Sequence, residues 1–356
     1  MTRSLWTPPR IADRASGRDN NFNFLRILAA TGVLISHAYP ISLGAEAAEP
    51  LSVFLGDVTL GTVSVMIFFS ISGFFITRSF AGRRSLGQFM QARALRLFPA
   101  LIVVLIVTVL VSGLWLTTAA PNEFWRAVPE YVLRNVTLFL PLYNLPGVFG
   151  ANPYGPAING SLWTLSYEVL CYLGVVLAGL AGLLTRPRVF AVALLGFAAV
   201  YGLDMGHPLH PRIDNLLRLG LPFVIGMAFW VWRRVIPLSV PVALILLAFA
   251  YLARQTAMIE PILALVLAYA VFVIGYAKTP MLAAYNRLGD YSYGTYVYAF
   301  PIQQMLAWFG IVDPLANIAL ALPATLCCAI LSWHLIEAPA MRLKVKTSDT
   351  EFTALV

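Results

Sequence analysis

The amino-acid sequence predicts an all-α fold, a polytopic membrane helix bundle of about ten transmembrane helices. The first observation is composition: 60% of the 356 residues are hydrophobic and only 11% are charged, whereas soluble domains carry about 25% charged residues. The second is a series of apolar segments near the roughly 20 residues that a helix needs to cross a hydrocarbon core. The third is that Lys and Arg gather in alternate connections between these segments, as in the cytoplasmic loops of membrane proteins.

Ten segments are candidate spans, although several are short or interrupted by proline. They cover about residues 22–41, 58–79, 98–118, 161–183, 188–204, 214–233, 239–254, 259–277, 290–310 and 316–337. The sequence shows no internal repeat and no second domain. We therefore expect a cytoplasmic N-terminal tail over residues 1–20, one transmembrane domain over 21–343 and a cytoplasmic C-terminal tail over 344–356.

The basic residues orient the predicted bundle. With ten spans and a cytoplasmic N-terminus, eighteen of the 24 Lys and Arg residues fall in cytoplasmic segments and five fall outside. This bias predicts that both termini are cytoplasmic. It also explains the net charge of +8 without nucleic-acid binding. The three cysteines, Cys171, Cys327 and Cys328, fall inside predicted spans and offer neither a disulfide framework nor metal-ligand spacing.

The first span carries Arg26 and His37 within its apolar sequence. A charged side chain at the centre of a membrane helix costs about 2.5–3.5 kcal/mol or more, so such residues usually line an aqueous path or a reaction site. Eleven helical steps of about 100° bring both residues to one face, about 16 Å apart along the axis. Ala29, Ala30 and Val33 lie between them on that face and leave room for a long, thin ligand.

Arg93 and Arg96 form an Arg-x-x-Arg pair just before the third span. On a helix they point to the same side, and two guanidinium groups at this spacing suit a phosphate. Arg78, Arg83 and Arg84 are close in sequence and strengthen an anion site. The alternative is a cytoplasmic basic loop that contacts lipid headgroups only.

The fourth span opens with Ser161-Leu-Trp-Thr-Leu-Ser-Tyr-Glu168. Glu168 lies about two turns below the predicted outer surface, so its carboxyl should face the bundle interior. It is a candidate to orient a catalytic imidazole or to bind an acceptor hydroxyl, and the alternative is a structural carboxylate. Trp163 and Ser166 in the same segment are candidate pocket residues.

The ninth span begins Gly289-Asp-Tyr-Ser-Tyr-Gly-Thr-Tyr296, and Ser292 and Tyr296 share a helical face. Pro301 should kink this helix beside a cavity, although simple packing of the tyrosines is the alternative. In the last span, His334 and Glu337 are expected to pair with each other or with nearby arginines. Within the outer segment 119–160, residues 123–140 are expected to form an interfacial or short re-entrant helix.

Taken together, these segments resemble the acyltransferase 3 family of bacterial integral membrane acyltransferases. Six motifs carry the resemblance, in chain order: Arg26 with His37, Phe68-Phe-Ser-Ile-Ser-Gly-Phe-Phe75, Arg93-Ala-Leu-Arg96, Trp163-Thr-Leu-Ser-Tyr-Glu168, Asp290-Tyr-Ser-Tyr-Gly-Thr-Tyr296 and Leu335-Ile-Glu-Ala-Pro339. Many members have a histidine near the proline of the ninth span, at the position of Ala299 here. The imidazole chemistry is therefore assigned to His37.

The resemblance implies a multi-pass enzyme of the bacterial inner membrane that transfers an acyl group, usually acetyl, from acyl-CoA to a hydroxyl. The acceptor would be a glycan or a lipid-linked sugar, and the other partners would be membrane lipids, with no metal. On this reading His37 is the general base and Glu168 a second catalytic residue. Arg26, Arg93 and Arg96 would bind acetyl-CoA. Ser292 and Tyr296, with Trp163 and Ser166, are candidates for the pocket or the oxyanion site.

Three alternatives remain open at this point. Intramembrane Arg, His and Glu residues equally suit a transporter or flippase for a glycan precursor, although no repeat symmetry typical of transporters is visible. The acceptor could instead be a macrolide-like small molecule. The chain could also be a non-catalytic membrane partner in a polysaccharide complex.

Overall fold

The computed structural model describes residues 8–15, 17, 20–56, 58–82, 85–286 and 288–344. The regular secondary structure within these ranges is entirely helical. Half of the predicted N-terminal tail, and all of the predicted C-terminal tail except Lys344, lie outside the described residues. So do six basic residues assigned to the cytoplasmic side: Arg3, Arg18, Arg83, Arg84, Arg287 and Lys346.

The helices follow one another with short connections. In the first half they are α1 (Ile11–Arg14), α2 (Phe22–Leu43), α3 (Pro50–Leu55), α4 (Leu60–Ala81), α5 (Leu86–Val111), η1 (Ser112–Leu116), α6 (Pro121–Thr137), η2 (Gly160–Leu162) and α7 (Trp163–Leu180). In the second half they are η3 (Leu183–Thr185), α8 (Pro187–Gly206), α9 (Pro211–Val231), α10 (Val240–Leu252), α11 (Ile259–Gly275), α12 (Pro280–Tyr285), α13 (Ser292–Trp308), α14 (Pro314–Ser332), η4 (Trp333–Glu337) and α15 (Ala338–Arg342).

Each of the ten predicted spans contains a helix, and seven helices in the described residues are long and apolar enough to cross a membrane. The other three are shorter. α10 has 13 residues and α11 and α13 have 17 each, which at about 1.5 Å per residue is less than a hydrocarbon core of about 30 Å. Length and composition therefore support a multi-pass membrane protein, and a count of ten spans stays a prediction.

α5 begins well before the predicted third span. Ser85 caps its first turn by accepting the Gln88 backbone N–H at 3.3 Å, and the helix runs from Leu86 to Val111. The Arg-x-x-Arg pair expected in a connecting loop therefore lies inside a long helix, which fixes both guanidinium groups on one side of the bundle.

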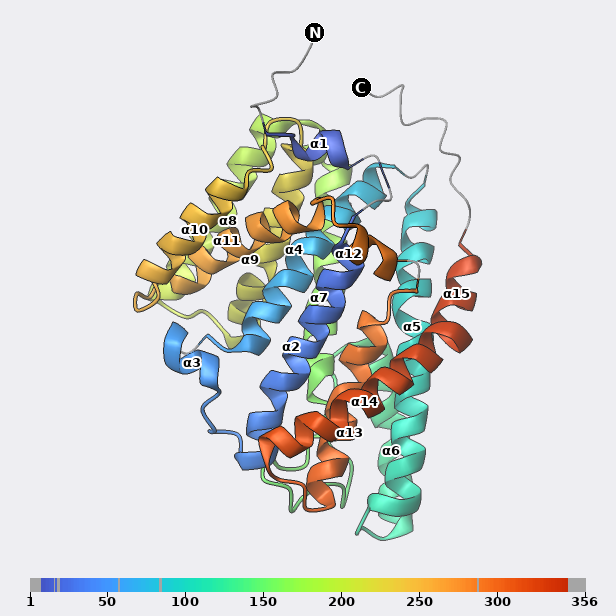
Figure 1. The fold of residues 1–356 in the computed structure, drawn as a ribbon. Helices are drawn as coiled ribbons and strands as arrows, with labels where there is room; N and C mark the ends of the chain where they lie inside the picture. Colours follow the sequence, from blue (N-terminus) through green and yellow to red (C-terminus); the bar gives the residue numbers. More distant parts are fainter. Residues whose placement is uncertain are drawn as a thin grey trace.

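α2 and α4 lie side by side in the middle of the bundle (Figure 1). On one side α9 packs along α4, and α10 and α11 follow; on the other, α13 and α14 pack on α2. Gly73 and Gly226 allow the α4–α9 contact, since a Cβ on Gly73 would come within 1.9 Å of the Phe223 carbonyl oxygen and one on Gly226 within 2.2 Å of the Ser70 carbonyl oxygen. Small residues at such crossings are typical of membrane bundles.

The predicted interfacial helix is confirmed as a helix, α6, which packs against the end of α5. The loop that follows is anchored by amide side chains: Asn152 donates to the Gln304 backbone carbonyl at 2.9 Å and Asn159 to that of Val297 at 2.9 Å. This loop thereby fixes the position of α13, which carries part of the candidate site.

Candidate active site

Two cavities lie inside the bundle, one at each half of α2. The larger, which we call the basic cavity, has a volume of about 690 Å³. Its lining includes five cationic residues, Arg26, Arg78, Arg93, Arg96 and Lys344, and two carboxylates, Glu168 and Asp290. This excess of positive charge suits an anionic ligand.

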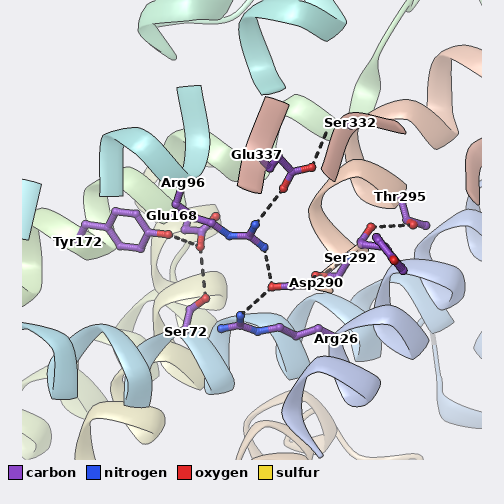
Figure 2. A network of polar contacts seen from close by, with 11 residues as sticks. Arg26, Ser72, Arg96, Glu168, Tyr172, Asp290, Ser292, Thr295, Ser332 and Glu337 are labelled. Carbon is purple, nitrogen blue, oxygen red and sulfur yellow. Dashed lines mark hydrogen bonds and ion pairs between the residues drawn. The ribbon is translucent and has the colours of Figure 1, made fainter. Parts of the chain in front are cut away.

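Asp290, just before α13, is the centre of the polar network that lines the basic cavity (Figure 2). Its Oδ2 accepts from Arg26 Nη1 at 3.3 Å and from Arg96 Nη2 at 2.6 Å. Its Oδ1 accepts from the Ser292 hydroxyl at 2.5 Å. This carboxylate therefore compensates the charges of two guanidinium groups. Since Asp290 is only 8% exposed, little water reaches the carboxylate itself.

Arg96 has a second carboxylate partner. Its Nη1 donates to Glu337 Oε2 at 2.9 Å, and the Ser332 hydroxyl donates to Glu337 Oε1 at 3.0 Å. Glu337 ends the π-helical turn η4, and such turns are frequent at functional sites. The expectation that Glu337 pairs with an arginine is confirmed. The Arg96 guanidinium is thus held between two carboxylates and positions α5, α13 and η4 relative to one another.

Gly289 brings Asp290 into this position. Its φ of +135° is a conformation that L side chains rarely adopt, and a Cβ there would lie 2.3 Å from the Trp333 indole nitrogen. Only glycine therefore fits between the chain and Trp333 at the point where the backbone turns into α13.

Glu168 lines the basic cavity from α7. Its Oε1 accepts from the Tyr172 hydroxyl at 2.6 Å, one helical turn further on, and from the Ser72 hydroxyl of α4 at 3.3 Å. Figure 2 shows this group on the opposite side of Arg96 from Ser332. The two hydroxyl donors fix the carboxyl of Glu168 facing the cavity interior.

The smaller cavity, which we call the histidine cavity, has a volume of about 380 Å³ and is lined by His37. The His37 ring packs edge-on against Phe300 of α13, with 5.2 Å between ring centroids. Within the described part of the chain, His37 Nδ1 is buried with no hydrogen-bond partner. No hydrogen bond between described residues therefore fixes the tautomer of this imidazole.

Three residues line both cavities: Val65, Thr164 and Tyr296. The Thr164 and Tyr296 hydroxyls are 2.5 Å apart, and these residues are only 3% and 7% exposed. Tyr296 also packs edge-on against Phe68. The two cavities therefore share one wall, and a hydrogen-bonded pair of hydroxyls forms part of it.

Comparisons with known proteins identify the family of this chain. A profile of the acyltransferase domain known as acyltransferase 3 matches residues 19–334, nearly the whole chain. The chain belongs to the acyltransferase 3 family. It is 28% identical over 334 residues to an "O-acetyl transferase" of Shigella phage Sf6, covering 90% of this chain and 95% of the relative. It is 30% identical over 375 residues to "Nodulation protein 10" of Rhizobium leguminosarum bv. viciae, covering 93% and 96%. No solved structure matches.

This acyltransferase brings most of the residues expected from its sequence to the two cavities. Arg26, Arg93, Arg96, Glu168 and Ser292 line the basic cavity. His37 and Trp163 line the histidine cavity, and Tyr296 lines both. Ser166 lines neither of these cavities, and its hydroxyl donates to the Leu138 carbonyl at 2.9 Å, which ties α7 to the end of α6.

Several functional candidates of the acyltransferase were not singled out from sequence. Asp290 stood inside a recognised motif, but its two arginine partners are 264 and 194 residues away in the chain. Glu49 is 5% exposed at the histidine cavity. Burial raises the pKa of the Glu49 carboxyl, and the Leu60 backbone N–H, which it accepts at 2.7 Å, lowers it in part.

The last of these candidates is an ion pair between α9 and α11. Arg218 donates to Glu260, with the Nε to Oε2 distance at 2.9 Å. Both residues line the histidine cavity.

Metal ligation is not indicated in the described ranges, where no group of three or more His, Cys, Asp or Glu side chains is placed to hold an ion.

Proposed function

We propose that this membrane acyltransferase transfers an acetyl group from acetyl-CoA to a hydroxyl of a glycan or lipid-linked sugar. The observation that carries the proposal is the shared wall: a donor in the basic cavity and an acceptor in the histidine cavity would meet at Val65, Thr164 and Tyr296. The relative named "O-acetyl transferase" supports transfer to an oxygen.

The charge of the basic cavity supports CoA as the donor. CoA is a polyanion because of its phosphates, and Arg78, Arg93 and Lys344 add three cations to the lining of the cavity beside Arg26 and Arg96. Guanidinium groups bind phosphate with two parallel hydrogen bonds. The uncharged pantetheine arm would then follow α2 from Arg26 toward His37, about 16 Å along the helix axis. Glu168 would accept a hydrogen bond from an amide of this arm.

His37 would act as the general base. Its Nε2 accepts the proton of the acceptor hydroxyl as that oxygen attacks the thioester carbonyl carbon. The C–O bond forms, and the carbonyl becomes a tetrahedral oxyanion stabilised by the Tyr296 hydroxyl. The oxyanion then collapses, the C–S bond breaks, and the imidazolium returns the proton to the CoA thiolate. A neutral imidazole with its proton on Nδ1 can accept a proton at Nε2 in the first step and return it in the second.

The membrane arrangement is part of the same proposal. Ten spans with both termini in the cytoplasm would place the basic cavity toward the cytoplasm of a bacterial inner membrane, where acetyl-CoA is made. The histidine cavity would then open toward the opposite side. The excess of Lys and Arg in the predicted cytoplasmic segments supports this orientation.

Substitution of His37 tests the proposal. We expect His37→Ala to lower the rate of acetyl transfer by about 10²–10⁴-fold, the usual contribution of a general base, while acetyl-CoA still raises the melting temperature of the purified protein. His207→Ala is the matched control, because His207 is exposed in the loop after α8. Full transfer by His37→Ala would remove His37 from the mechanism. Movement of a glycan precursor across vesicles without acetylation would instead favour a transporter.

A further inference from the structure

We propose that the acceptor subsite, the histidine cavity, binds a neutral, hydroxyl-rich sugar ring that carries neither a carboxylate nor a phosphate. Glu49, Asn215 and the Arg218–Glu260 pair select this ring. This inference rests on the proposed function and adds the charge of the acceptor and the residues that select it. The histidine cavity at about 380 Å³ is within the range of about 300–1,000 Å³ for small-molecule sites.

The polar groups of this cavity match the hydrogen-bonding pattern of a sugar. A sugar hydroxyl donates one hydrogen bond and accepts others, so it needs both carboxylate acceptors and N–H donors nearby. Glu49 and Glu260 supply acceptors, and Arg218 and Asn215 supply donors. Each carboxylate oxygen has two lone pairs, so Glu260 can accept from a ligand while it holds Arg218.

Ser36 and Asn215 add neutral polar groups to the cavity. Ser36 is only 6% exposed and lines the cavity with a hydroxyl. Asn215 is half-buried and lines it with an amide. A hydroxyl and an amide can each donate to and accept from a sugar hydroxyl, so these two groups suit a neutral polar ligand beside His37.

Trp163 supplies the apolar surface that a sugar ring also needs. It lines the histidine cavity and packs edge-on against Tyr167, with 5.7 Å between ring centroids. It precedes Thr164, a residue of the shared wall. A ring lying on the indole would keep its hydroxyls directed at the polar groups and one of them near His37.

The charges of the two cavities differ in sign. The histidine cavity has two carboxylates, Glu49 and Glu260, against one cation, Arg218. Asp214, which is not part of the lining, lies 3.8 Å from Arg218 and compensates that cation further. In a partly buried site an anionic sugar would face uncompensated like charges. The cavity should therefore reject uronic acids and phosphorylated sugars, whereas the basic cavity attracts the anionic donor.

The test uses the purified full chain, acetyl-CoA and a matched set of methyl glycosides. The neutral probes are the glucoside, galactoside, mannoside and rhamnoside, and the anionic probes are the glucuronoside and galacturonoside, which carry a carboxylate at C6. At least one neutral glycoside should be acetylated. Its kcat/KM should exceed that of the corresponding uronoside by about ten-fold or more, the value of one unfavourable charge contact near 1.4 kcal/mol.

Two conservative variants locate the effect. Glu260→Gln should raise the KM for the neutral glycoside about ten-fold and leave the KM for acetyl-CoA unchanged. Glu49→Gln can still accept the Leu60 N–H, so the fold is kept, and it should reduce the preference against uronosides. Glu130→Gln is the control, because Glu130 forms an exposed ion pair with Arg134 on α6.

The outcomes separate the inference from the proposed function. If acetyl-CoA raises the melting temperature but no neutral glycoside is acetylated, or uronosides react equally well, the acceptor inference is overturned and the donor site stands. An unchanged glycoside KM in Glu260→Gln overturns it as well. If acetyl-CoA does not stabilise the protein, the proposed function fails and the inference falls with it.

Discussion

Asp290 should be the most sensitive charged residue of the bundle, and the variant Asp290→Asn tests this. The asparagine keeps the size of the side chain but removes the negative charge that Arg26 and Arg96 share at 3.3 and 2.6 Å. Removing one partner of a buried ion pair usually costs about 3–5 kcal/mol, because the remaining charge is left uncompensated. The arginine side chains are 23% and 19% exposed in a polar cavity, and this partial solvation lowers the expected cost to about 2–3 kcal/mol.

The assay is equilibrium unfolding of the purified protein in mixed micelles, with Asp313→Asn as the control. Asp313 caps α14 at an exposed position by accepting the Ala316 N–H at 2.8 Å, and asparagine caps a helix equally well. We expect the control to change the free energy of unfolding by less than about 0.5 kcal/mol. Equal stabilities of Asp290→Asn and Asp313→Asn would refute the reasoning.

A double variant shows whether uncompensated charge is the cause. In Asp290→Asn with Arg26→Met, one of the two cations that lose their partner is also removed. The double variant should therefore be more stable than the sum of the single effects predicts, with a coupling of about 1 kcal/mol or more. Simple additivity would mean that the loss comes from packing around the loop before α13 and not from charge.

Two further predictions concern the donor site and the shared wall. Arg93→Ala should weaken the affinity for acetyl-CoA, measured by isothermal titration, by about ten-fold or more. Arg96→Ala should mainly destabilise the protein, because it leaves Glu337 buried without its cation. An unchanged affinity in Arg93→Ala would contradict the assignment. Tyr296→Phe should lower kcat for acetyl transfer by about 10²-fold with an unchanged KM for acetyl-CoA, the effect of losing one oxyanion donor, whereas an unchanged kcat would exclude the hydroxyl from that role.

Much of the fold could be predicted from sequence because the membrane imposes strong local constraints. Apolar segments of the right length predicted a helix at each of the ten positions, and all ten contain one. The boundaries were less predictable: α5 begins at Leu86, about twelve residues before the predicted span. Gln88, Gln91, Arg93 and Arg96 interrupt the apolar residues of its first three turns, so hydropathy alone does not detect them, although Ser85 is a typical N-cap residue.

The individual residues of the candidate site could be predicted from sequence, but the ion pairs between them could not. The intramembrane cost of charge pointed to Arg26, His37 and Glu168, and the structure places all three at cavities. That Arg96 lies between Asp290 and Glu337 could not be predicted, because the partners are 194 and 241 residues away in sequence. Helical periodicity shows which face a residue lies on, but not which helix packs against that face.

The separation of the cavities constrains where the reaction can occur. A polyanionic donor such as CoA is favoured where cations predominate and disfavoured where carboxylates predominate, whereas a neutral acceptor is not excluded from the carboxylate-rich cavity. The two reacting atoms must approach within about 3–3.5 Å of each other before a bond can form. Because the cavities share Val65, Thr164 and Tyr296 in their linings, the proposed mechanism has this approach occur at that wall. The Tyr296 hydroxyl would accept from Thr164 there and donate to the developing oxyanion.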